Sequence, residues 1–109
     1  MKWSDLDTAS CPIARSLSVV GDRWTLLILR DCFLGKTRFD MFQQSLGLTR
    51  HVLAERLAKL VEAGVLAKEA YAKGRFDYRL TDQGKMLAPV LSALFDWGKE
   101  NVPPAQSKP

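Results

Sequence analysis

The stretch SLGLTRHVLAERLAKLVEAG, residues 45–64, decides the fold of this chain. Thr49 is of a type that caps helix N-termini and Gly64 of a type that ends helices, so the sequence predicts a helix from Thr49 to about Ala63. Just upstream, TRFDMFQQSL at residues 37–46 predicts another helix, and only "GL" separates it from the capping threonine. Two helices joined by three or four residues with a glycine have the spacing of a helix-turn-helix, although ordinary helical hairpins share it.

The predicted helix 49–63 has two different faces at 100° per residue. The core stripe consists of Leu53, Leu57, Leu60 and Val61. The opposite face carries His51, Glu55, Lys59 and Glu62, flanked by Val52 and Arg56, with Arg50 nearer the apolar side. In a lone helix such a mixed-charge face is most often an ordinary solvated surface.

The residues after Gly64 change from helical to alternating periodicity. VLAKEAY (65–71) and RFDYRLT (75–81) flank AKG, which predicts a β-hairpin with Lys73, Gly74 and Arg75 at its tip. Along the second strand, one face holds Phe76, Tyr78 and Leu80, and the other holds Arg75, Asp77 and Arg79. A basic hairpin directly after a helix-turn-helix is the layout of a winged helix. We therefore expect a mainly α fold with a small β-hairpin wing (α+β).

Two further helices are predicted upstream of the helix-turn-helix. In CPIARSLSVVG (11–21), Cys11 lies at the N-cap, Pro12 fits the first helical position, and Gly21 can end the helix in a left-handed conformation. In DRWTLLILRDCFLG (22–35), Asp22 is the expected cap. The apolar character of this second helix predicts burial on most sides, at the centre of the core.

The segment TDQGKMLAPVLSALFDWGKENV, residues 81–102, predicts one helix that starts at Thr81 and is kinked at Pro89. Its apolar stripe exceeds what the core of a 109-residue chain needs. We therefore expect a homodimer through the terminal helices, the alternative being a helix that closes a monomer core. The expected interface residues are Leu87, Val90, Leu91, Leu94, Phe95 and Trp97.

Bulk composition narrows the class of protein. The net charge is +4, and residues 36–85 hold ten Lys or Arg against six Asp or Glu, which accounts for the whole excess. No apolar run approaches the roughly 18 residues of a membrane helix, and the N-terminus has no signal-peptide core, so a cytoplasmic location is expected. Two cysteines and one histidine argue against a disulfide framework or a metal site. We expect no enzyme activity and no cofactor, because no phosphate loop or catalytic cluster is present.

The stretches CPIARSLSVVGDRWTLLILRDCFLG, TRFDMFQQSLGLTRHVLAERLAKLVEAGVL and YRLTDQGKMLAPVLSALFDWG resemble the HxlR-type branch of the MarR-like winged-helix transcriptional regulators. The resemblance covers roughly residues 11–101, with an N-terminal arm at 1–10 and a tail, expected to be disordered, at 102–109. It implies a homodimeric DNA-binding regulator, with the recognition helix at 49–63 and the wing around Gly74. Met41 stands where the family usually has Glu, and Lys68 where it has Arg. The wing tip is about two residues shorter than is typical, which puts its reach into the minor groove in doubt.

On this reading the partner is double-stranded DNA, with an inverted-repeat operator bound by the two-fold dimer. The residues expected to read base edges are Arg50, His51 and Glu55, with Val52 against a thymine methyl group. The residues expected at phosphates are Arg38, Thr49, Arg56 and Lys59, with Lys73 and Arg75 at the neighbouring minor groove. A repressor is the expected mode of action. A winged helix that binds only proteins remains an alternative, which an apolar or acidic outer face would favour.

Two kinds of effector remain open. Cys11 precedes a helix, whose N-terminus favours a thiolate, and some members of the resembling family sense oxidants or electrophiles with a cysteine at this "CP" position. The alternative is a cysteine that only caps the helix. Cys32, in an apolar helix, is expected to be an inert core residue. Trp24 and Trp97 could line a pocket for a small molecule, although such residues are more often plain core.

Overall fold

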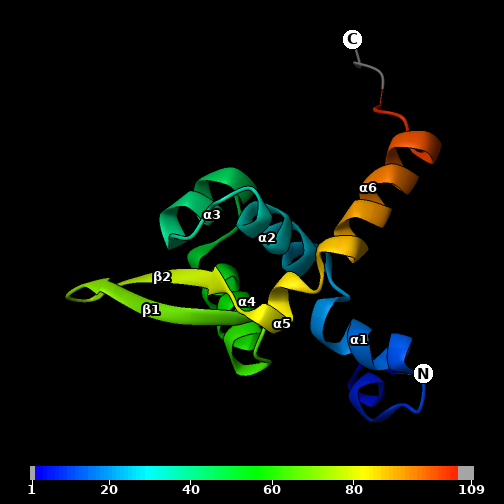
Figure 1. The fold of residues 1–109 in the computed structure, drawn as a ribbon, viewed down its shortest axis with the longest axis horizontal. Coiled ribbons are helices and arrows are strands. Elements are labelled where there is room, and N and C mark those ends of the chain that lie inside the picture. The colour runs from blue at the N-terminus through cyan, green and yellow to red at the C-terminus, as the bar shows by residue number, and fades with distance from the viewer. Residues whose placement is uncertain (1, 106–109) are drawn as a thin grey trace.

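The computed structural model describes residues 2–105 and confirms the predicted winged helix-turn-helix layout (Figure 1). Helices dominate, and the single sheet among these residues is a two-stranded antiparallel hairpin. The elements in chain order are η1 (Trp3–Thr8), α1 (Pro12–Val20), α2 (Arg23–Phe33), α3 (Phe39–Leu46), α4 (Arg50–Glu62), β1 (Leu66–Ala72), β2 (Arg75–Leu80), α5 (Asp82–Lys85) and α6 (Ala88–Asn101).

The core lies where α2, α3 and α4 meet the base of the hairpin. The predicted stripe of α4 is confirmed, because Leu53 and Leu57 are fully buried and Leu60 is 1% exposed. Ile28 and Leu29 of α2 pack against them, together with other apolar side chains. Burial of about five such side chains, each contributing roughly 1.5–3 kcal/mol, fixes α4 with its opposite face in solvent.

The expected burial of α2 on most sides is only partly correct. Thr25, Ile28 and Leu29 are buried, but Leu34 is 70% exposed and Phe33 is 37% exposed. The reason is that α3 and α4 cover one side of α2, whereas α6 meets another side at an angle and leaves it partly open (Figure 1).

Two helix caps follow the sequence prediction. Asp22 accepts a hydrogen bond from the backbone N–H of Thr25 at 2.9 Å, and Thr49 accepts one from that of Val52 at 3.2 Å. The prediction for Gly21 was wrong, because this residue ends α1 in a right-handed conformation, with φ of −79°. A Cβ atom at Gly21 would lie 2.3 Å from the carbonyl oxygen of Leu17, so close approach favours glycine here instead.

The wing is a tight hairpin. Leu66 pairs with Leu80 at its base and Ala72 with Arg75 at its tip, and the register shifts between Ala70 and Ala72. Only Lys73 and Gly74 form the turn, and Gly74 has a φ of +71°, which glycine adopts without strain. The short turn agrees with the short tip expected from the sequence.

The prediction of one helix kinked at Pro89 was wrong. Two helices form, α5 and α6, and the break lies at Met86 and Leu87 rather than at the proline. Pro89 lies in the first turn of α6, where the missing N–H has no helical partner to lose and the fixed φ suits a helix start. The proline therefore begins a helix instead of bending one.

The two ends of the described chain are a short N-terminal helix and the C-terminal helix α6. The N-terminal arm is not extended, because its helix η1 packs on α1. Helix α6 ends at Asn101, and part of the tail expected to be disordered, residues 106–109, lies outside the described residues. Within residues 2–105, no helix combines the length and apolarity needed to cross a membrane.

Candidate nucleic-acid interface

The N-terminal half of α4 presents a solvent-facing surface beside the wing. The side chain of His51 is 88% exposed and that of Glu55 is 60% exposed, and their Nε2 and Oε2 atoms lie 3.8 Å apart. Val52 is half-buried next to them. These three predicted base-reading positions therefore share one accessible strip at the N-terminal end of α4.

Arg50 leaves α4 in a different direction. Its guanidinium lies 4.6 Å from the ring centroid of Phe39, and Nη1 is 3.4 Å from Oε1 of Gln43 and 3.7 Å from Oδ1 of Asp40. The side chain is still 71% exposed. Arg50 therefore lies against α3 and could reach either a base edge or a phosphate at the turn between the two helices.

Two of the expected phosphate-binding residues have partners inside the protein. Arg56 is only 25% exposed, donates from Nε to Oδ1 of Asp22 at 3.3 Å, and also pairs with Glu55. The ammonium group of Lys59 lies 5.7 Å from the ring centroid of Trp3 in the arm. The sequence offered no sign of either contact, since both join segments far apart in the chain.

The ion pair between Asp22 and Arg56 ties α4 to the start of α2. Burial alone would raise the pKa of Asp22. Hydrogen bonds from Thr25 and the nearby charge of Arg56 outweigh burial and hold that pKa below its usual range. Asp22 therefore stays ionised at neutral pH, and Arg56 supports the orientation of α4 from its side.

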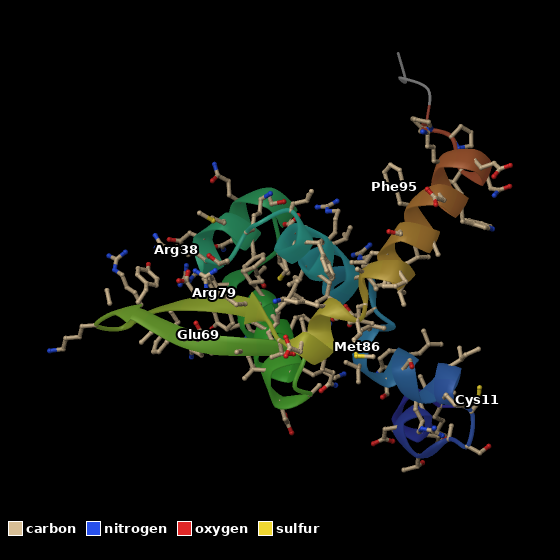
Figure 2. All side chains as sticks on the ribbon, viewed as in Figure 1. Cys11, Arg38, Glu69, Arg79, Met86 and Phe95 are labelled. Atoms are coloured by element: carbon tan, nitrogen blue, oxygen red, sulfur yellow. The ribbon has the colours of Figure 1, made fainter. Side chains whose placement is uncertain are left out.

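Arg38, another expected phosphate contact, lies between α3 and the hairpin (Figure 2). Its guanidinium stacks 3.9 Å from the ring centroid of Tyr71, and its Nε donates to Oδ1 of Asp77 at 3.3 Å. Asp77 is 6% exposed, although its strand neighbours Arg75 and Phe76 are exposed. The contacts of Asp77 and Tyr71 with Arg38 were not predicted from the sequence, where the only signal was a lone acidic residue on a basic strand face.

The environment of Asp77 keeps it charged. Burial alone would raise its pKa, but the hydrogen bonds from Thr37 and Arg38, and then the charges of Arg79 and Arg38, hold the pKa of this carboxyl below its usual range. The carboxylate at the root of the wing is therefore ionised at neutral pH and surrounded by cations.

The tip of the wing carries exposed positive charge. Lys73 and Arg75 are both exposed. Behind the tip, a hollow of about 440 Å³ separates α3 from the hairpin. Residues lining it include Arg38, Tyr71, Arg75 and Phe76. The hollow therefore has two arginines and one aspartate, Asp40, on its border.

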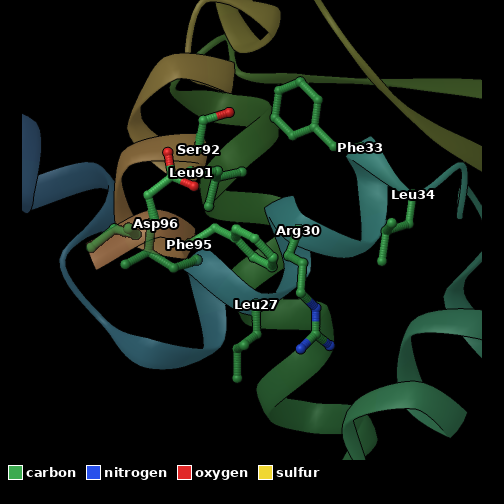
Figure 3. Close-up of a pocket in the computed structure, with 10 residues that line it drawn as sticks. Leu27, Arg30, Phe33, Leu34, Leu91, Ser92, Phe95 and Asp96 are labelled. Atoms are coloured by element: carbon green, nitrogen blue, oxygen red, sulfur yellow. The ribbon is translucent and has the colours of Figure 1, made fainter. Parts of the chain in front are cut away.

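The expected dimer residues lie on or beside an exposed apolar surface of α6. Leu94 is 48% exposed, Phe95 68%, Trp97 62% and Val90 43%, while Leu87 and Leu91 are half-buried. Figure 3 shows a groove of about 500 Å³ between α6 and α2, lined by Phe95 and Leu91 on one side and Leu27 on the other. Neither Trp24 nor Trp97, the residues suggested for a ligand pocket, is part of this lining.

The two cysteines lie in opposite environments. Cys11 is exposed, and its sulfur makes no close capping hydrogen bond. The backbone N–H groups of Ala14 and Ile13 at the start of α1, together with the charge of Arg15, lower the pKa of its thiol. Burial and the nearby Asp31 raise the pKa of Cys32 to about 12. Of the two thiols, Cys11 therefore has both the greater exposure and the lower pKa.

Together, the helix-turn-helix, the exposed strip on α4 and the basic hairpin define a winged helix-turn-helix protein. The sequence profile of the HxlR-like helix-turn-helix family matches residues 19–106, and the chain belongs to this family. It is 40% identical over 99 residues to the HTH-type transcriptional regulator Mb3122 of Mycobacterium bovis, covering 89% of this chain but only 63% of that protein's length.

Solved structures agree with the fold. The structure of PA1607, described as a candidate transcription factor, aligns with a TM-score of 0.86 at 47% identity, covering 97% of this chain and 75% of that chain. The redox regulator HypR in its reduced form aligns with a TM-score of 0.78 at 28% identity, covering 84% of this chain and 93% of HypR.

Proposed function

We propose that this protein is a sequence-specific, double-stranded DNA-binding transcriptional regulator that binds an inverted-repeat operator as a homodimer. The observation that carries the proposal is the accessible strip of His51, Val52 and Glu55 on α4, placed between a buried core stripe and a basic wing. A helix of this kind fits the major groove, where base edges present distinguishable donors and acceptors. An operator that overlaps a promoter would make the bound dimer a repressor, because polymerase could not occupy the same DNA.

Dimerisation is part of this proposal. A single unit offers few phosphate contacts and therefore weak, salt-sensitive binding. Two units joined through α6 would place two recognition helices on successive turns of one face of the duplex. The exposed apolar side chains of α6 support this arrangement, since monomers rarely leave large apolar patches in water.

The test is binding of the purified protein to DNA from upstream of its own gene, titrated with salt and with competitor DNA. We expect a steep salt dependence together with binding that resists competition. Arg50→Ala should weaken operator binding by roughly 5- to 150-fold, the range of a lost base contact of 1–3 kcal/mol. Lys85→Ala removes the same charge from exposed α5 and serves as the control. Equal losses for the two variants would mean that Arg50 does not read the operator.

Thiol-based regulation is a second candidate, supported by the exposure and lowered pKa of Cys11 and by the similarity to the redox regulator HypR. Iodoacetamide should label Cys11 much faster than Cys32, with a rate that rises with pH as the Cys11 thiolate forms. Mass spectrometry of the labelled peptides measures both rates.

The regulatory consequence is tested with a quinone or diamide in the DNA-binding assay. We expect either reagent to lower the affinity of the wild-type protein and of Cys32→Ala, but not that of Cys11→Ser. If Cys11→Ser responds as the wild-type protein does, Cys11 has no sensing role.

A further inference from the structure

Asp77 is the one buried acidic residue of the wing in the described chain, and it joins β2 to the segment before α3. It accepts hydrogen bonds from Oγ1 of Thr37 at 2.9 Å, from Nε of Arg38 at 3.3 Å and from Nη2 of Arg79 at 3.3 Å. The backbone strengthens the same junction, since the N–H of Tyr78 donates to the carbonyl of Thr37 at 2.7 Å. The segment before α3 is therefore fixed to β2 at the level of Asp77.

Arg38 is held at two points by this junction. Its Nε atom is bonded to Asp77, and the plane of its guanidinium lies on the ring of Tyr71. Within the part of the chain that the structure describes, its two terminal nitrogens make no hydrogen bond. The side chain is 48% exposed. Arg38 is thus immobilised, yet two of its donor groups remain available to an external acceptor.

A carboxylate at the position of Asp77 would by itself weaken DNA binding, so a compensating effect must act through a neighbouring cation. A negative charge beside a DNA-binding surface repels phosphates. A free arginine, on the other hand, loses about 2 kcal/mol of rotamer entropy when it is ordered on binding. Ordering Arg38 in advance removes part of that cost, and the fork geometry of arginine suits a phosphate oxygen pair.

We infer that Asp77 is a positioning residue for DNA binding, which acts by holding Arg38 between α3 and the wing so that its terminal nitrogens meet a phosphate of the duplex. The inference rests on the proposed function and adds a residue to it that makes no contact with DNA itself. The phosphate would lie at the Arg38 and Arg75 side of the hollow between α3 and the hairpin, which Asp40 also lines. The side chain of Asp40 is 90% exposed and lies 3.7 Å from Arg50.

The experiment compares Asp77→Asn with Glu69→Gln. Glu69 is the strand partner of Asp77, is 61% exposed, and lies 3.9 Å from Arg79, but makes no hydrogen bond to Arg38. Each substitution removes one negative charge from the same hairpin, so the general electrostatic effect should tighten DNA binding in both. If Asp77 positions Arg38, Asp77→Asn should instead weaken DNA binding, and Glu69→Gln should not.

We expect Asp77→Asn to bind the operator several-fold more weakly than the wild-type protein. The slope of log affinity against log salt should become shallower by up to about 0.9 per protomer, the value for one lost phosphate contact. Glu69→Gln should bind as well as the wild-type protein or better. Asp77→Asn in an Arg38→Ala background should cause no further loss, because the aspartate acts through the arginine.

Two measurements separate positioning from a loss of structure. Thermal unfolding shows whether Asp77→Asn is folded, and the Nε–H signal of Arg38 in NMR spectra should exchange faster with water in this variant, in the absence of DNA. If Asp77→Asn does not fold, Arg38→Lys keeps the charge but loses the fork and the stacking, and it should weaken binding to a similar extent.

The outcomes are distinct. Binding by Asp77→Asn as tight as by Glu69→Gln, or full affinity of Arg38→Lys, would overturn the positioning role and leave the proposed function intact. A wild-type protein that binds no DNA sequence specifically would overturn the proposed function and this inference with it.

Discussion

Replacing Leu94 with glutamate is expected to give a monomer whose affinity for the operator falls by at least about 100-fold. Leu94 is 48% exposed on α6 and, like Phe95, lines the groove that α6 forms with α2. A second copy that covers this surface would bury the leucine, and a carboxylate there would lose its hydration without a partner. The dimer should therefore dissociate.

The large effect on DNA binding follows because the two DNA-binding units are no longer joined. In a dimer, binding of the first unit makes the second event intramolecular, which raises overall affinity by about 10²- to 10⁴-fold. The monomer retains α4 and the wing and should still bind weakly to a half-site. Analytical ultracentrifugation gives the mass, and a fluorescence anisotropy titration gives the affinity.

Ala93→Glu is the control, because it adds the same charge to the neighbouring exposed position, which is not among the expected interface residues. It should leave both the mass and the affinity near those of the wild-type protein. A monomeric Leu94→Glu protein with full operator affinity would contradict the proposal that dimerisation is part of recognition.

Replacing Gly84 with alanine should have the largest effect on folding. A Cβ atom there would lie 2.1 Å from the carbonyl oxygen of Val65 and 3.2 Å from Cδ2 of Leu80. The obstructing oxygen belongs to the backbone and also accepts the N–H of Thr81 at 3.1 Å. We expect the free energy of unfolding to fall by roughly 3 kcal/mol, the upper end for overpacking, because the backbone cannot swing aside.

Chemical denaturation measures this loss, and Lys85→Ala, in the same helix, is the control. Alanine elsewhere in a helix is better than glycine by about 1 kcal/mol, so unchanged or increased stability of Gly84→Ala would show that the close approach is not limiting. The same geometry accounts for Thr81 and Gly84 in the stretch YRLTDQG, residues 78–84. Thr81 caps α5 through the N–H of Gly84 and donates to the carbonyl of Gly64 at 2.6 Å.

The features that could be predicted from the sequence are those whose causes are local. The caps at Asp22 and Thr49 involve partners three residues away, and the leucine stripe of α4 repeats every three or four residues. The short turn of the wing also followed from adjacent residues. These features are determined by interactions between residues that are close together in the sequence.

The features that sequence analysis missed depend on partners far apart in the chain. Arg56 meets Asp22 across 34 residues, and Arg38 meets Asp77 across 39 residues. Alternation along β2 assigns Asp77 to the polar face, but only the approach of the segment before α3 makes that position buried. The break between α5 and α6 was misplaced because the sequence did not show that the first helix ends at Met86, which leaves Pro89 in the first turn of a new helix.

The short wing has a consequence for the shape of the operator. The hairpin is fixed to the segment before α3 at Asp77, and three residue steps of about 3.3 Å each lead from there to Gly74, so the wing extends only about 10 Å beyond this point. Lys73 stands at its end on a flexible stem. A short basic wing attracts the DNA backbone but does not distinguish between bases. The operator sequence should therefore be well defined within each half-site and variable in the flanking base pairs that the wing contacts.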